Sequence, residues 1–145
     1  MINARSNRPL ALTMGDPAGI GGEIALMAWR RRKENSPCFF VVDDPARLAD
    51  LAERLGFPST VHAIDAPEQA SAVFDSVLPI LPLPKELDRA AAVVASIEIA
   101  TSLVRDGLAA ALVTNPIHKE SLYDAGFRHN GHTEFLAELA GLDQT

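Results

Sequence analysis

Short apolar runs alternate with amphipathic stretches along most of this 145-residue chain. Compact apolar runs bounded by Gly, Pro or Asp are typical of buried strands. They predict strands at Pro9–Met14, Phe39–Asp43, Thr60–Ile64 and Ala109–Val113. Helical periodicity and capping signals predict helices between them, and these span about Ile20–Arg32, Pro45 to just before Gly56, and Glu86–Asp106.

The longest predicted helix has the clearest periodicity. Its inner face is predicted to consist of the residues that recur at helical spacing, namely Leu87, Ala91, Val94, Ile97, Thr101 and Val104. Residues 67–84 are different, because Pro79, Pro82 and Pro84 break any helix. This stretch is therefore predicted to be a loop or an edge strand with some extended structure.

Strands that alternate with helices indicate an α/β fold, with a mainly parallel sheet covered by helices on both faces. Residues 1–8 are interpreted as a polar leader. Residues 9–145 are interpreted as one α/β unit, without an internal repeat, a linker or a low-complexity segment.

The composition narrows the class of protein. A net charge of −6 argues against nucleic-acid binding, and the basic run at Arg30–Lys33 is interpreted as a solvated helix end. No apolar run approaches the roughly 20 residues that a membrane span requires, and no signal peptide is evident, so a cytoplasmic location is expected. The single cysteine, Cys38, is interpreted as a buried strand thiol.

A glycine-rich turn follows the first predicted strand, at Met14–Glu23. Its glycines allow backbone conformations closed to other residues and let a ligand approach the main chain. The turn lacks the lysine of a phosphate-binding Walker loop and the glycine spacing of a dinucleotide fingerprint. A tight structural turn and a ligand-binding loop both remain open, and Asp16 is either a turn residue or a pocket residue.

A second polar segment, Thr114–Glu120, follows the last predicted strand. Asn115 is predicted to cap a helix that begins at Pro116, with His118 and Lys119 in its first turn. Lys119 would then lie near the carboxyl edge of the sheet, where it could hold a phosphate or carboxylate. An exposed lysine and a solvent histidine are the alternative.

A third polar segment is Gly131–Phe135. Thr133 is predicted to cap a helix, and His132 just before it could donate a hydrogen bond to an oxyanion or a substrate hydroxyl. His129 and His132 have neither helical ligand spacing nor a neighbouring cysteine, so no complete metal site is expected within this chain.

Together the three polar segments resemble the 4-hydroxythreonine-4-phosphate dehydrogenase family of pyridoxal phosphate biosynthesis. The resemblance is carried by Met14–Gly21 (MGDPAGIG), Val113–Glu120 (VTNPIHKE) and Gly131–Glu134 (GHTE), in the family's order and spacing. It runs from about Pro9 to the end of the chain. Two positions depart from the family pattern, because Gly22 stands where proline is common and Asn115 where a small residue is usual.

The resemblance implies a two-domain architecture like that of isocitrate and isopropylmalate dehydrogenases, and a homodimer whose active sites use both subunits. It implies oxidation of 4-phosphohydroxy-L-threonine with NAD, followed by loss of carbon dioxide, assisted by a divalent metal such as Zn, Mg or Co. His132 and Thr133 are carried over as substrate-binding residues. Lys119 is placed near that pocket with His118 and Asn115, and Asp16 with its glycines is placed along the cleft.

The family's metal-binding histidines, and most of its nicotinamide-binding surface, lie beyond Thr145. The chain therefore resembles the N-terminal portion of such an enzyme, and by itself it is expected to bind neither cofactor and to be inactive. Three other readings stay open. They are a related dehydrogenase of threonate or erythronate 4-phosphate, a non-catalytic α/β module that binds phosphorylated metabolites, and a truncated gene product with exposed apolar surface.

Overall fold

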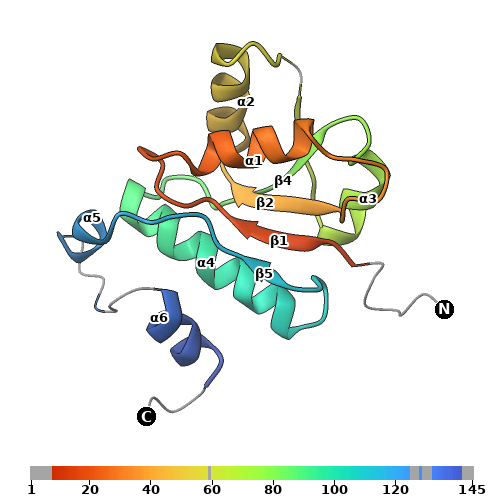
Figure 1. Ribbon diagram of the computed structural model, residues 1–145. Helices are drawn as coiled ribbons and strands as arrows, with labels where there is room; N and C mark the ends of the chain where they lie inside the picture. The colour runs from red at the N-terminus through yellow and green to blue at the C-terminus, as the bar shows by residue number, and fades with distance from the viewer. Residues whose placement is uncertain (1–7, 59, 125–127, 129–131, 142–145) are drawn as a thin grey trace.

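The computed structural model describes residues 8–58, 60–124, 128 and 132–141. In this part of the chain five parallel strands form one sheet in the order β3-β4-β2-β1-β5 (Figure 1). The strands are β1 (Leu10–Thr13), β2 (Phe39–Asp43), β3 (Val61–Ala63), β4 (Leu78–Pro82) and β5 (Leu112–Val113). The helices are α1 (Gly21–Arg30), α2 (Pro45–Arg54), α3 (Ala70–Val73), α4 (Arg89–Arg105), α5 (Lys119–Asp124) and α6 (His132–Leu139), with a 3-10 turn η2 at Pro67–Gln69.

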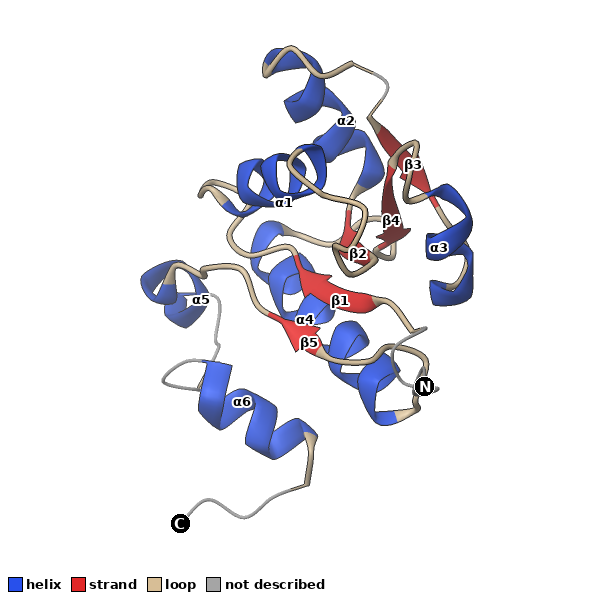
Figure 2. Ribbon diagram, turned by 45° about the vertical axis from the view of Figure 1, so that its right-hand side comes forward, coloured by secondary structure: helices blue, strands red, loops and turns tan. Residues whose placement is uncertain are grey.

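Helices cover both faces of the sheet, as the alternation of strands and helices predicts (Figure 2). Leu12 and Val41 point to one face, where they pack with the inner residues of α1 and α2. Their neighbours Ala11 and Phe40 point to the other face, where Ala100 of α4 joins the same cluster. Successive side chains of a strand point to opposite faces, so each buried strand supplies both cores. The predicted α/β class is confirmed.

The capping signals around α2 are also confirmed. The Asp44 carboxylate accepts a hydrogen bond from the Ala46 N–H at 3.0 Å, and Pro45 occupies the first turn. Gly56 lies beyond the last turn with a φ of +84°, a left-handed conformation that favours glycine. At Gly22 an added Cβ would lie 2.7 Å from Cδ2 of Leu51. The glycine at this position therefore lets α2 pack closely against α1.

The prediction for residues 67–84 was wrong in an important respect. The stretch contains α3 and an interior strand, β4, which lies between β3 and β2. Pro79 precedes the β2–β4 register, which begins at Val41↔Ile80. Pro82 follows the β3–β4 register, which ends at Ala63↔Ile80. The missing N–H of Pro79 therefore removes no hydrogen bond from the β2–β4 ladder, and that of Pro82 removes none from the β3–β4 ladder. For this reason an interior strand tolerates both prolines.

Helix α4 begins later than predicted, and its buried face overlaps the predicted one only in part. Asp88 caps it by accepting from the Ala91 N–H at 2.7 Å, and Glu86 just before it has a φ of +70°, which no helix allows. Its buried residues are Val93, Ser96, Ile97 and Ala100. Of the predicted inner face only Ile97 is fully buried, and Leu87 lies outside the helix with 38% of its surface exposed. The pattern misled because Ser96, a polar residue, faces the sheet.

The end of α1 differs from a simple solvated terminus. The Arg30 guanidinium stacks on the Phe57 ring at 3.9 Å, and that of Arg32 stacks on the Trp29 ring at 3.7 Å. Cys38 is half-buried and lies one residue before β2, so it is not a strand residue. Burial and the nearby Asp75 carboxylate raise the pKa of its thiol to about 11.

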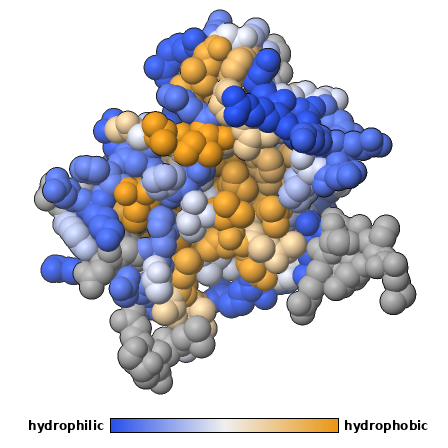
Figure 3. All heavy atoms as spheres, in the orientation of Figure 1, coloured by the Kyte–Doolittle hydropathy of each residue, from blue (hydrophilic) through white to orange (hydrophobic). Residues whose placement is uncertain are grey.

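Strand β5 is shorter than predicted and lies at one end of the sheet order in the described part of the chain. Apolar side chains gather on the face that carries α1, β1 and β5 (Figure 3). Among the exposed large apolar residues are Val113 of β5, at 42%, and Ile24 of α1, at 41%. None of the described helices combines the length and apolar character needed to cross a membrane.

Candidate active-site edge of the sheet

The candidate residues follow the carboxyl ends of parallel strands. Met14–Ile20 follows β1 and Thr114–His118 follows β5, and these two strands are neighbours with Ala11 opposite Leu112. Parallel strands end at a common edge, where open α/β sheets bind their ligands. Two of the three polar segments predicted from the sequence are therefore side by side in space.

Asn115 joins these two segments, and the predicted helix cap at this position was wrong. Its backbone N–H donates to Oγ1 of Thr13 at 3.0 Å, and its side-chain amide donates to the Thr13 carbonyl oxygen at 2.8 Å. The side chain is therefore committed to β1 and is only 6% exposed. Residues 114–118 have no regular secondary structure, and α5 begins only at Lys119. Asn115 shapes the edge through β1.

Gly15 provides the close contact at this junction. Its φ is +70°, and an added Cβ would lie 2.8 Å from both Cβ of Asn115 and the Pro116 carbonyl oxygen. Asp16 then donates its backbone N–H to the same Pro116 oxygen at 2.9 Å. The first glycine of the turn is thus required by the backbone geometry and by the packing of the neighbouring loop.

The buried hydroxyl of Ser96 supports this junction through two hydrogen bonds. The Met14 N–H donates to Oγ of Ser96 at 2.9 Å, and this hydroxyl donates to the Val42 carbonyl oxygen at 2.7 Å. Ser96 is 0% exposed, and it connects α4 to the ends of β1 and β2. This role was not predicted, because a serine in an apolar helix gives no local signal of a hydrogen bond to a residue 82 positions away.

Asp16 and His118 lie together in two adjoining cavities. The larger has a volume of about 490 Å³ and runs along the glycine turn, between Ala18–Ile20 and Pro116–His118. The smaller, of about 90 Å³, is closed by Arg89 and Val93 of α4 and by Leu122 of α5. Asp16 also accepts the Ala18 N–H at 2.9 Å, so it is at once a turn residue and a cavity residue. Arg89 was not among the site residues predicted from the sequence.

Lys119 and the third polar segment take different positions from those predicted. Lys119 is the exposed first residue of α5 rather than part of a helix that begins at Pro116. Helix α6 begins at His132, so Thr133 lies in its first turn and does not cap it. Neither His132 nor Thr133 is among the described lining residues of the two cavities above. His129 and Gly131 fall outside the described residues.

His132 has an unusual environment. It is half-buried, and its Nε2 is a buried atom without a hydrogen-bond partner among the described residues. Burial lowers the pKa of its imidazole below the ordinary value. Phe135, one turn further along α6, packs into a cluster with Met14 of the glycine turn and Val93 of α4. A polar atom that is buried without a partner is a candidate for contact with a ligand.

The described residues do not offer a metal site. They contain no group of three or more His, Cys, Asp or Glu side chains that could hold an ion.

Comparison with known proteins decides the family. A family model described as pyridoxal phosphate biosynthetic protein PdxA matches residues 35–145. The chain belongs to this family. The PdxA relative from Methylorubrum populi, a 4-hydroxythreonine-4-phosphate dehydrogenase, is 49% identical over 94% of this chain and 42% of its own length.

Solved structures agree with the family and the fold. The 4-hydroxythreonine-4-phosphate dehydrogenase of Klebsiella pneumoniae matches with a TM-score of 0.77 and 29% identity, over 92% of this chain and 45% of that protein. The enzyme of the same name from Burkholderia phymatum matches with a TM-score of 0.76 and 26% identity, over 94% and 44% of the two chains. This PdxA-family chain therefore spans less than half the length of these relatives.

Proposed function

We propose that this chain is the N-terminal part of an NAD- and divalent-metal-dependent dehydrogenase. The proposed enzyme oxidises and decarboxylates 4-phosphohydroxy-L-threonine in pyridoxal 5'-phosphate biosynthesis. Membership of the PdxA family carries this proposal, because the relatives at 40–49% identity share the name 4-hydroxythreonine-4-phosphate dehydrogenase. The homodimer and the phosphorylated substrate belong to the same proposal.

The role proposed for His132 and Thr133 is substrate binding. With a lowered pKa, the His132 imidazole is neutral at pH 7, where one ring nitrogen donates a hydrogen bond and the other accepts one. We propose that its unpartnered Nε2 bonds a polar group of the substrate, and that the adjacent Thr133 hydroxyl provides a second bond. These bonds hold the substrate while the remaining part of the enzyme supplies the metal ligands.

Asp16 and His118 are proposed to border the same cleft, Asp16 on the side of β1 and His118 on the side of β5. Their shared cavities support this placement, since they open beside the glycine turn at the carboxyl edge of the sheet. Lys119 is proposed to contribute positive charge near the entrance. Asn115 enters the proposal only as a support for the turn, because its side chain is bonded to Thr13.

A chimaera tests the substrate-binding role. Residues 1–145 would replace the matching segment of the Methylorubrum populi relative, and NADH formation from 4-phosphohydroxy-L-threonine would be followed at 340 nm. His132→Gln and Thr133→Val are each expected to lower kcat/KM by about ten- to a hundredfold, the cost of one to two substrate hydrogen bonds. His62→Gln, an exposed residue of β3, is the matched control. If His132→Gln behaves like His62→Gln, the role of His132 is wrong.

A further inference from the structure

The topology of the sheet creates a second crevice, between β2 and β4. The chain leaves β2 for α2, which covers one face of the sheet, and leaves β4 for α4, which covers the opposite face (Figure 2). These two strands are adjacent, with Val41 opposite Ile80. Adjacent parallel strands whose connections go to opposite faces form a switch point, the place where open α/β sheets bind ligands. The glycine turn borders this crevice through Met14 and Pro17, whereas the described residues of the other two polar segments do not line it.

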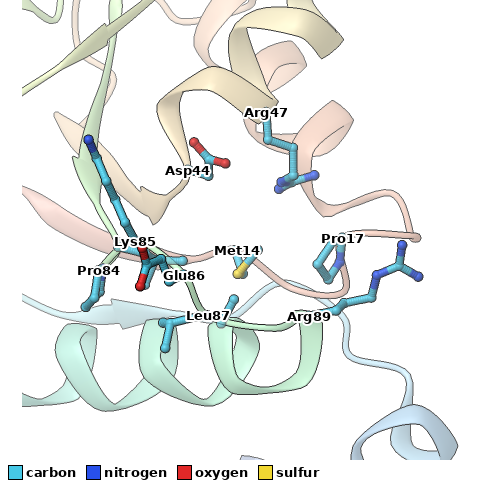
Figure 4. Close-up of a pocket in the computed structure, with 11 residues that line it drawn as sticks. Met14, Pro17, Asp44, Arg47, Pro84, Lys85, Glu86, Leu87 and Arg89 are labelled. Carbon is cyan, nitrogen blue, oxygen red and sulfur yellow. The ribbon is translucent and has the colours of Figure 1, made fainter.

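A cavity of about 410 Å³ lies at this switch point (Figure 4). Asp44 and Arg47 border it from the side of β2, and residues 83–87 and Arg89 border it from the side of β4. Met14 also lines it. The volume lies within the range of about 300–1,000 Å³ typical of small-molecule sites. It suits a metabolite of a few carbon atoms.

Arg47 is held in place beside this cavity by a buried carboxylate. Its Nε and Nη2 donate to the two carboxylate oxygens of Asp43, at 3.1 and 2.5 Å, and Asp43 is 0% exposed. Figure 4 shows the guanidinium directed into the cavity. The N–H groups of Nη1 take no part in this ion pair. A forked pair of this kind fixes the guanidinium plane, so the remaining donors have a set direction.

The other charged residues at the cavity do not provide a comparable group. The Asp44 carboxylate is engaged with the Ala46 N–H at the start of α2. Lys85 and Glu86, of opposite charge, lie across the cavity from Arg47, and the Arg89 guanidinium points away from it (Figure 4). Among the described lining residues, Arg47 is therefore the cation fixed toward the interior. Glu86 also has a φ of +70°, and such strain is often found where a ligand is held.

We propose that this cavity is a phosphate-binding site for a small phosphorylated metabolite, with Arg47 as the ligand of the phosphate and Asp43 as its positioning residue. A planar, permanently charged guanidinium with donors to spare matches the oxygens of a phosphate monoester. The cavity adjoins the smaller Asp16–His118 cavity, because Arg89 lines both, but Arg47 lines only the former among the described residues. The inference goes beyond the proposed dehydrogenase and does not rest on it.

Titration calorimetry of the 145-residue chain tests the site, with inorganic phosphate and O-phosphothreonine as probes at constant ionic strength. The double variant Asp43→Asn/Arg47→Met removes the cation without leaving a buried charge unpaired. Its phosphate affinity is expected to fall by about tenfold or more, the effect of losing a charge-assisted bond. Arg54→Met, which removes the same charge from the last turn of α2, is the control and is expected to change the affinity by less than about twofold.

Two further variants separate binding from folding. Asp43→Asn keeps the Arg47 cation but removes the carboxylate that positions it, so it is expected to weaken phosphate binding. Asp43→Asn/Arg47→Lys restores a flexible charge and is expected to bind better than the Met variant but worse than the native chain. Circular dichroism establishes that each variant is folded.

Several outcomes would overturn the site. The first is that the native chain binds no detectable phosphate. The second is that the Arg47 and Arg54 variants lose phosphate affinity equally. The third is that malonate binds as strongly as phosphate. The last outcome would assign the cavity to carboxylates. All of these measurements are made without NAD or turnover. A failure here would therefore leave the dehydrogenase proposal standing, and an inactive chimaera would leave this site standing.

Discussion

Replacing Gly15 by alanine probes the junction on which the candidate site is built. This glycine has a φ of +70°, and a Cβ would lie 2.8 Å from both Cβ of Asn115 and the Pro116 carbonyl oxygen. Gly56→Ala is the matched control. Gly56 has a φ of +84°, and nothing lies within 4 Å of the position its Cβ would take. The two substitutions therefore share the backbone strain and differ only in the contact with the β5 loop.

The expected difference in the free energy of unfolding follows from the backbone strain and from the contact with the β5 loop. A left-handed non-glycine residue costs roughly 1–2 kcal/mol, and the alanine recovers about 0.4–1 kcal/mol by restricting the unfolded chain. Gly56→Ala should therefore destabilise the chain by about 0–1.5 kcal/mol. Gly15→Ala adds overpacking against the neighbouring loop, which typically costs about 1–3 kcal/mol, for a total of about 1–4.5 kcal/mol.

Urea unfolding followed by circular dichroism measures both free energies, and the variants should keep the m-value of the native chain. A second measurement localises the effect. Amide exchange of Asn115, whose N–H donates to Thr13, should accelerate in Gly15→Ala and stay unchanged in Gly56→Ala. Equal destabilisation by the two substitutions would show that the glycine turn and the β5 loop are not packed as described.

Three other expectations concern single residues. Ser96→Ala leaves the buried Met14 N–H without its acceptor, so it should lower the free energy of unfolding in urea by about 1–3 kcal/mol. The control Ser102→Ala, on the same helix, should lower it by less than about 0.5 kcal/mol. The folded pKa of His132 lies below 6.5, so the stability that its neutral form contributes is present above pH 6.5 and is lost as the pH falls through the folded pKa. His132→Gln should flatten that part of the pH profile of the free energy of unfolding, and an unchanged slope would contradict the lowered pKa. Cys38, with a pKa of about 11, should react with iodoacetamide at pH 8 more slowly than free cysteine, and an equal rate would argue against its burial.

The features that the sequence predicted well are set by local chemistry. Asp44, Pro45 and Gly56 delimit α2 through capping and backbone preferences that act within a few residues. The run Phe39–Val42 is apolar throughout, which indicates a strand buried on both faces, and all five residues of β2 are buried. Such signals are present in the residues themselves, so no knowledge of the partner elements is needed.

The features that were mispredicted depend on partners far along the chain. Whether proline is tolerated in β4 depends on the register with β2 and β3, which no local pattern contains. Asn115 has the composition of a helix cap, yet its amide bonds Thr13, 102 residues away. Ser96 breaks the apolar pattern of α4 because the end of β1 needs an acceptor. The cavity at Arg47 arises from sheet topology.

Formation of NADH by the chimaera is the decisive test of the proposed dehydrogenase function. We expect residues 1–145, joined to the remaining part of the Methylorubrum populi relative, to oxidise 4-phosphohydroxy-L-threonine with NAD in the presence of magnesium or zinc. The chain alone should produce no NADH, and erythronate 4-phosphate should be a poor substrate for the chimaera. A folded, dimeric chimaera without activity, or NADH formation by the isolated chain, would refute the proposed function.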